Sequence, residues 1–127
     1  MNILLVDDSS TMRTIQKKAL GALGQDVTFT EASDGVVALS AIAAAGAPFD
    51  VILLDWNMPN MDGLTMATRL RQTDKKTPII MVTTEAEKSR IIDALKAGVN
   101  NYVIKPFTPD VLVGKVKQTL EKLRAAA

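Results

Sequence analysis

The chain of 127 residues contains no cysteine and no histidine. Without cysteine it can form neither a disulfide framework nor a thiolate metal site, and without histidine it has no His-based catalytic triad and no His-liganded zinc. Any reaction chemistry must therefore use aspartate, threonine, lysine or tyrosine side chains.

An excess of charge of either sign is also absent, because 15 Lys and Arg residues face 14 Asp and Glu residues. This balance gives no reason to expect nucleic acid as a partner. The apolar runs are about four to five residues long, too short for a membrane span or a signal-peptide core. We therefore expect a cytoplasmic protein without membrane attachment. Residues 1–127 suit one domain with one ordinary core.

Five short apolar segments alternate with five segments of helical periodicity. The predicted strands are 2–6, 27–30, 51–54, 78–82 and 102–104. The predicted helices begin at Ser9 or Ser10, at Asp34, near Gly63, near Lys88 and at Pro109, and the first two end at Gly24 and Gly46. Spacing places Ile15 on the apolar face of the first helix and Val36 on that of the second. Strands joined through helices run parallel, so the pattern predicts an α/β fold with a doubly wound five-stranded sheet and five helices.

Residues 51–54 are apolar on both alternating faces, which is typical of a central strand covered on both sides. Asp55 follows directly and is expected at the carboxyl end of the sheet, where open α/β folds bind their ligands. The same edge should receive the residues that follow the other strands, namely Asp7, Asp8, Thr83, Thr84 and Lys105. The sequence therefore predicts one cluster of polar side chains at this edge.

Three carboxylates in one cluster repel each other unless protons or cations offset their charge. Magnesium suits such a site, because it binds one or two carboxylates, a carbonyl and waters, and leaves positions for phosphate oxygens. Asp55 is then the natural nucleophile toward phosphorus, forming an acyl phosphate. Interpretations without a functional site stay open, since Asp7 and Asp8 could be charges at a helix N-terminus and Lys105 could be a solvated lysine.

These residues together resemble the receiver domain of two-component response regulators, over residues 2–123. The resemblance rests on Asp7-Asp8, Asp55 with Met58-Pro59 and Asp62-Gly63, Thr83, and Lys105-Pro106-Phe107. Within the family, residues 55–64, 81–83, Glu85-Ala86 and Tyr102 are most similar to single-domain chemotaxis regulators. The resemblance implies a flavodoxin-like strand order, 2-1-3-4-5. It also implies that no output domain is present and that the protein is not an enzyme beyond its own phosphorylation and dephosphorylation.

The resemblance further implies that Asp55 accepts a phosphoryl group from a phosphohistidine of a histidine kinase. Magnesium, or manganese in its place, would be bound by Asp8, Asp55 and the backbone carbonyl of Asn57, with Asp7 helping through water. Thr83 and Lys105 would hold the phosphoryl oxygens. In the family the peptide bond between Lys105 and Pro106 is cis.

A switch and a partner face are implied in the same way. Thr83 would move toward the phosphoryl group while Tyr102 swings inward. Asn57, Thr84 and Glu85 would tune the lifetime of the phosphoryl group, and Thr84 departs from the alanine common at its position. The face expected to bind partners contains Lys88, Ile91, Leu95, Tyr102, Ile104 and Lys115. Its expected occupants are a flagellar motor switch protein or another phosphorylation-dependent partner, and a phosphatase, bound to a monomer.

Three alternative functions remain. A single-domain receiver in a phosphorelay or stress-signalling pathway would use the same chemistry with another partner. An aspartyl-nucleophile phosphohydrolase similar to haloacid dehalogenases would need a second acid where Asn57 stands. A flavodoxin-like electron carrier would need a phosphate-binding loop after the first strand, where Asp7 and Asp8 would repel a flavin phosphate.

Overall fold

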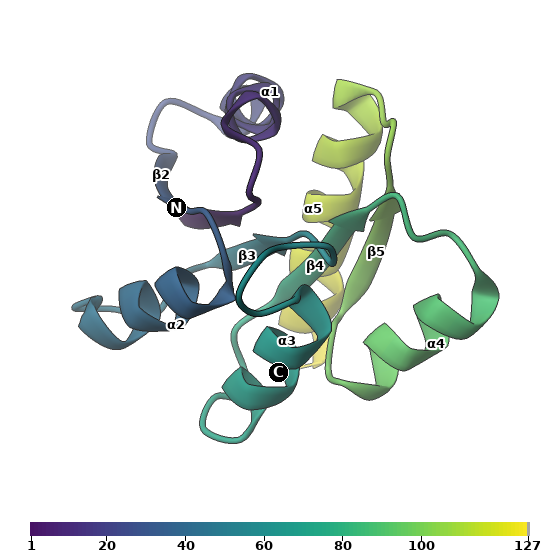
Figure 1. Ribbon diagram of the computed structural model, residues 1–127. Helices are drawn as coiled ribbons and strands as arrows, with labels where there is room; N and C mark the ends of the chain where they lie inside the picture. The colour runs from purple at the N-terminus through teal and green to yellow at the C-terminus, as the bar shows by residue number, and fades with distance from the viewer. Residues whose placement is uncertain (127) are drawn as a thin grey trace.

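The computed structural model describes residues 1–126 and contains one parallel five-stranded sheet with helices on both faces (Figure 1). The strands are β1 (Asn2–Val6), β2 (Thr28–Ala32), β3 (Val51–Leu54), β4 (Ile79–Thr83) and β5 (Asn101–Ile104). Their order is β2-β1-β3-β4-β5. The helices are α1 (Ser10–Leu20), the short 3-10 helix η1 (Gly21–Leu23), α2 (Gly35–Ala44), α3 (Gly63–Arg71), α4 (Lys88–Lys96) and α5 (Pro109–Ala126). The predicted α/β class and strand order are confirmed.

The two faces of β3 belong to two different parts of the core. Ile52 and Leu54 pack with residues of α2, α3 and α4, whereas Val51 and Leu53 pack with residues of α1 and α5. All four side chains are buried. Figure 1 shows the corresponding layers, with α1 and α5 on one side of the sheet and α2, α3 and α4 on the other. The prediction of a central strand covered on both faces is therefore correct, and Asp55 follows its last residue.

Side-chain caps fix where most helices begin. The Ser9 hydroxyl accepts a hydrogen bond from the Met12 N–H at 3.1 Å, which caps α1. Carboxylates of Asp34 and Asp62 accept backbone N–H groups in the same way at 2.9 and 2.7 Å, and thereby cap α2 and α3. These side chains satisfy backbone donors that have no partner inside the helix. The starts predicted at Ser9 and Asp34 are confirmed, and α5 begins at Pro109 as predicted.

Several predicted boundaries differ from the structure. β4 covers 79–83 instead of 78–82, and β5 begins at 101 instead of 102. β2 covers 28–32 instead of 27–30, because it pairs with the whole of β1, from Asn2 opposite Thr28 to Val6 opposite Ala32. The first helix is α-helical only to Leu20 and continues as η1 before Gly24. The second helix ends at Ala44, two residues before Gly46. Helix and strand ends depend on tertiary contacts, and the spacing of apolar residues in the sequence does not show those contacts.

Two residues were also assigned wrongly to the apolar faces of helices. Ile15 is 44% exposed, and the buried positions of α1 are Gln16, Ala19 and Leu20. Val36 is 48% exposed, because α2 instead buries its small residues Gly35 and Ala38. A Cβ atom at residue 35 would lie only 3.0 Å from the Met61 side chain, so a larger residue here would require Met61 to shift. None of the helices described is long and apolar enough to cross a membrane.

Candidate functional site

The carboxyl ends of β1, β3, β4 and β5 bring the predicted polar residues to one edge of the sheet, called here the carboxyl edge. Asp7, Asp8 and Asp55 each place one carboxylate oxygen within 4.8 Å of the others. The Lys105 Nζ lies 2.8 Å from Asp7 Oδ2 and 3.3 Å from Asp55 Oδ2. The predicted cluster therefore forms from residues up to 98 positions apart in the chain.

The three carboxylates differ in what surrounds them. Asp7 is buried, and its Oδ1 accepts the Ser9 N–H at 2.9 Å while its Oδ2 faces Lys105. Asp55 is also buried, and its Oδ1 accepts the Trp56 N–H at 2.7 Å. Asp8 is exposed. The cluster thus has one well-paired acid, one acid directed at a lysine, and one acid open to solvent.

Burial raises the pKa of Asp55, because the charged carboxylate is removed from water. The Lys105 ammonium group opposes this rise, whereas the nearby Asp7 charge adds to it. One ammonium group therefore balances three carboxylates only in part. An all-oxygen donor set with excess negative charge is the kind of site that magnesium prefers. The residues present fit a divalent cation.

Glu85 connects three residues that the sequence singled out separately. Its N–H donates to the Thr83 hydroxyl at 3.3 Å, and its carboxylate accepts the Asn57 side-chain N–H at 3.1 Å. Its carbonyl accepts a hydrogen bond from the Tyr102 hydroxyl. Burial raises the pKa of Tyr102 to about 12, and the negative charge of Glu85 acts in the same direction. Tyr102 therefore lies inward, as a neutral hydrogen-bond donor, beside the loop that follows β4.

Gly63 is a site residue whose role sequence reasoning missed. Its N–H donates to the Trp56 carbonyl at 2.8 Å, which holds the loop after β3 against the start of α3. A Cβ atom at this position would lie 2.1 Å from the backbone oxygen of Asp55, closer than any real contact. The Asp62-Gly63 pair was visible in the sequence as a turn signal. Its spacing did not show that the turn presses on the backbone of Asp55.

Two arginines that the sequence did not single out also contact the site. Arg13 of α1 donates to the Asp7 carbonyl, and its Nε lies 3.0 Å from Glu31 Oε1 on β2. Arg90 of α4 places its guanidinium group 5.3 Å from the centre of the Trp56 ring, within cation–π range. Both contacts depend on how the helices pack on the sheet. No sequence pattern pointed to them.

The residues predicted for the partner face differ in exposure. Lys88, Leu95 and Ile104 are exposed, whereas Ile91 and Lys115 are half-buried. Ile91 packs against the core, so the alternative interpretation of this residue as core is correct, but for Leu95 it is wrong. The inclusion of Tyr102 in the surface needs correction, because its side chain is only 9% exposed.

The remaining predicted residues are placed as follows. Thr83 is completely buried, whereas Asn57 in the loop after β3 and Thr84 in the loop after β4 are exposed. The peptide bond between Lys105 and Pro106 is cis, as the resemblance implied.

Comparisons with known proteins agree with this geometry. The family described as response regulator receiver domain matches residues 3–117. Chemotaxis protein CheY1 of Helicobacter pylori is 49% identical over 122 residues, which cover 94% of this chain and 97% of that protein. Chemotaxis protein CheY of Pseudomonas aeruginosa is 45% identical over 125 residues, covering 97% of this chain and 98% of that protein.

Solved structures show the same likeness in three dimensions. The chemotaxis protein CheY4 of Vibrio cholerae superposes with a TM-score of 0.82 at 33% identity, covering 93% of this chain and 97% of that one. The receiver domain of the Francisella response regulator 1452 superposes with a TM-score of 0.84 at 30% identity, covering 95% and 97%. Sequence and structure thus agree over almost the whole chain, and the protein belongs to the response regulator receiver domain family.

Proposed function

We propose that this protein is a phosphorylation-activated response regulator whose phosphoryl acceptor is Asp55. The observation that carries the proposal is the cluster of Asp7, Asp8 and Asp55 around Lys105 at the carboxyl edge. A carboxylate oxygen of Asp55 attacks the phosphorus of a phosphohistidine on a histidine kinase. The new bond joins that oxygen to phosphorus, and the phosphorus–nitrogen bond breaks. The electron pair returns to the imidazole, which takes up a proton from water, and Asp55 becomes an acyl phosphate.

Magnesium, with manganese as a substitute, fits this site through Asp8, Asp55 and the backbone carbonyl of Asn57, with Asp7 acting through water. When bound, the cation offsets the negative charge of the carboxylates and of the phosphoryl oxygens. Lys105 supports the same oxygens, since its ammonium group already lies between Asp7 and Asp55. The Asp7 carboxylate holds Lys105 in this position through a 2.8 Å ion pair.

Loss of the phosphoryl group restores the starting state. Water attacks phosphorus, the bond from phosphorus to the Asp55 oxygen breaks, and inorganic phosphate leaves. We propose that Asn57, Thr84 and Glu85 set the rate, because they belong to the loops that follow β3 and β4. The hydrogen bond between Asn57 and Glu85 joins these two loops. The protein does not act on other substrates in this scheme.

The signal leaves the site through Thr83 and Tyr102. The Thr83 hydroxyl accepts the Glu85 N–H, and the Glu85 carbonyl accepts the Tyr102 hydroxyl. If the phosphoryl oxygens attract the Thr83 hydroxyl, the loop that carries Glu85 must rearrange, and with it the support of Tyr102 on β5. The predicted partner face lies on the elements that would feel this change, namely α4, β5 and α5.

The partner is proposed from the relatives, several of which are named chemotaxis proteins. The output would then be contact with a flagellar motor switch protein, and a phosphatase would end the signal. A phosphorelay or stress-signalling partner is the alternative. A pull-down with and without beryllofluoride, a phosphoryl mimic, separates the two, because each outcome identifies a different class of captured protein.

Phosphorylation itself is tested with acetyl phosphate as the donor. The wild-type protein should become labelled in the presence of magnesium, and Asp55→Asn should not, while its circular dichroism remains that of the folded protein. Trp56 is the only tryptophan and directly follows Asp55, so its fluorescence should report binding at the site. We expect a saturable change with magnesium that is lost in Asp8→Ala. Equal labelling of Asp55→Asn, or a response to beryllofluoride in metal-free buffer, would contradict the proposal.

The role of Lys105 has a separate test. Lys105→Ala should retain or tighten magnesium binding, because a competing cation is removed. It should also reduce the gain in partner binding on phosphorylation, since a complete switch needs about 5.5 kcal/mol of bias toward the active state. An unchanged gain would show that Lys105 is not part of the coupling.

A further inference from the structure

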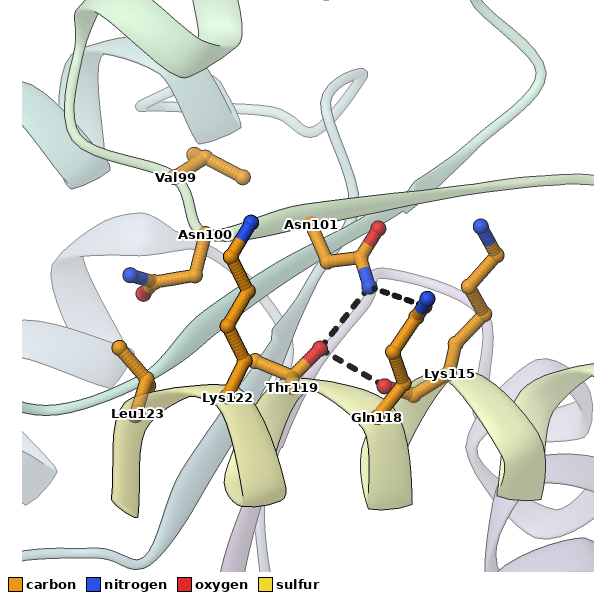
Figure 2. Close-up of a pocket in the computed structure, with 8 residues that line it drawn as sticks. All are labelled: Val99, Asn100, Asn101, Lys115, Gln118, Thr119, Lys122 and Leu123. Atoms are coloured by element: carbon orange, nitrogen blue, oxygen red, sulfur yellow. Dashed lines mark hydrogen bonds between the residues drawn. The ribbon is translucent and has the colours of Figure 1, made fainter. Parts of the chain in front are cut away.

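A cavity of about 470 Å³ lies between the start of β5 and the second half of α5 (Figure 2). It opens at the amino end of β5, whereas the acidic cluster lies beyond the carboxyl ends of the strands. Its volume is within the range of about 300 to 1,000 Å³ found for small-molecule sites. The side chains that form its rim and walls include Val99, Asn100, Lys115, Gln118, Lys122 and Leu123.

The polar groups on the inner side of the cavity are already paired with each other. The Asn101 side-chain N–H donates to the Thr119 hydroxyl at 2.9 Å and to the Gln118 side-chain oxygen at 3.3 Å. The Thr119 hydroxyl, which is buried, donates to the Lys115 carbonyl at 2.7 Å. Figure 2 shows these three bonds as dashed lines. They hold the amide of Gln118 in a defined orientation at the cavity.

The same pairing leaves hydrogen-bond donors for a ligand. Because the Gln118 oxygen accepts Asn101, the free end of this amide is its Nε2 group. The Asn100 oxygen accepts the Ile79 N–H at 2.8 Å and the Arg71 Nη2 at 3.1 Å, which leaves the Asn100 Nδ2 group. Both amides therefore offer N–H donors, and their acceptors are used within the protein.

Two lysines add positive charge to these donors. Lys115 and Lys122 both line the cavity, and none of its lining residues is acidic. Within residues 1–126, neither lysine forms an ion pair. They stand seven positions apart on α5, which separates their backbones by about 10 Å along the helix. Val99 and Leu123 provide apolar surface in the same cavity.

We propose that this cavity binds a small organic dianion, with one anionic group near each lysine and a short hydrocarbon part against Val99 and Leu123. A site that offers only donors and positive charge selects carboxylate or phosphate oxygens, which accept hydrogen bonds and carry negative charge. The binding does not require phosphorylation. Because Lys115 also belongs to the predicted partner face, a bound dianion engages a residue that a protein partner would otherwise use.

The test is an amide NMR titration of metal-free protein, so that the probes cannot bind through a metal ion at the acidic cluster. The probes are glutarate, which has two carboxylates, and phosphoglycolate, which has a phosphate and a carboxylate. We expect saturable shifts of the side-chain NH₂ signals of Asn100 and Gln118 with at least one probe. The stronger probe identifies which anionic group the site prefers. Acetate at equal ionic strength should give no saturable shift.

Matched variants then separate a site from diffuse charge. The double variant Lys115→Gln with Lys122→Gln should weaken binding at least tenfold, whereas Lys117→Gln, an exposed lysine of the same helix outside the cavity, should bind as the wild type does. All variants should keep the dispersed amide spectrum of the folded protein. Absence of saturation with both probes would overturn the proposal, and so would equal loss of binding in Lys117→Gln. Neither result would affect the proposed phosphorylation of Asp55.

Discussion

Two aspartates at opposite ends of the sheet show how the same side chain can serve different purposes. Asp74 lies before β4, at the amino ends of the strands, and Asp55 follows β3 at the carboxyl ends. Burial alone would raise the pKa of Asp74, but hydrogen bonds from the side chain and backbone of Thr77 and the backbone of Lys76 outweigh it and lower that pKa. At Asp55 burial prevails, and the pKa is raised.

The pKa values of Asp74 and Asp55 shift in opposite directions because the two carboxylates accept different numbers of hydrogen bonds. Asp74 Oδ1 accepts the N–H groups of Lys76 and Thr77 at 2.9 and 3.0 Å, and Asp74 Oδ2 accepts the Thr77 hydroxyl. Asp55 accepts one backbone N–H and faces Lys105, which it shares with Asp7. A carboxylate with all its partners inside the protein stabilises the fold. A carboxylate with few hydrogen-bond donors, such as that of Asp55, is available for a cation and a phosphoryl group.

The largest expected effect comes from closing the space at the carboxyl edge. Gly63→Ala should destabilise the protein by about 3 kcal/mol or more, because its Cβ atom would overlap the backbone oxygen of Asp55 and the backbone cannot yield as a side chain can. Thermal or urea unfolding measures the loss. Gly114→Ala on α5 is the matched control, since nothing lies within 4 Å of its added Cβ, and it should stabilise by roughly 0.5 to 1 kcal/mol. Equal effects of the two variants would remove the argument for a tight turn at Asp55.

The next prediction tests the two aspartates directly. Asp74→Asn should lower the free energy of unfolding by about 2 kcal/mol, because hydrogen bonds to a charged acceptor are lost. Asp55→Asn should raise it by an amount on the order of 1 kcal/mol, because a buried charge that also repels Asp7 is removed. Urea unfolding at neutral pH and low magnesium measures both. The comparison fails if the two variants change stability in the same direction.

Low pH should reduce the loss of stability caused by Asp74→Asn. The folded pKa of Asp74 is lower than its unfolded value near 3.8, so its contribution to stability is complete above that pH. It is lost as pH falls through the folded pKa. The difference in stability between wild type and Asp74→Asn should therefore be constant from pH 7 to about 5 and shrink below about 4. A difference that stays constant down to pH 2 would show that the carboxylate charge does not matter.

Gln16 of α1 sharpens the comparison, because it is a buried polar side chain that is uncharged and incompletely paired. Its Oε1 is the one buried side-chain polar atom without a hydrogen-bond partner among the residues described. Gln16→Leu should raise the free energy of unfolding by about 1 kcal/mol, since the cost of an unsatisfied polar atom is removed. Acetyl phosphate labelling should not change. Reduced labelling would mean that this glutamine supports the site from within α1.

The smallest effect concerns the ionisation of Tyr102, which does not change the free energy of unfolding at neutral pH. It is the only tyrosine, so absorbance at 295 nm follows its ionisation alone. The folded protein should titrate near pH 12 and the denatured protein near about 10. Because the folded pKa is the higher one, stability is complete below about pH 10 and is lost as pH rises toward 12. A midpoint near 10 in the folded state would show that the phenol is not held inward.

Much of the fold followed from residues that are close in sequence. The apolar run 51–54 has no polar face, and Asp55 ends it, so a buried strand with an acid at its end could be predicted without any tertiary information. Ser9 and Asp34 cap helices through bonds to residues three positions away. The boundaries and faces that were wrong, such as β2, Ile15 and Val36, depend on which neighbour each element packs against.

The α/β alternation and the residue types at the strand ends could be predicted from the amino-acid order, because hydrophobic period and capping act over a few residues. The three-dimensional fold was needed to show which acid is paired and which is open, since Lys105 reaches Asp7 across 98 positions. It also decided that Gly63 must lack a side chain, and that Lys115 and Lys122 share a cavity with Asn100. Such contacts form between elements whose relative placement comes from burying both faces of one sheet, and that placement is a property of the whole chain.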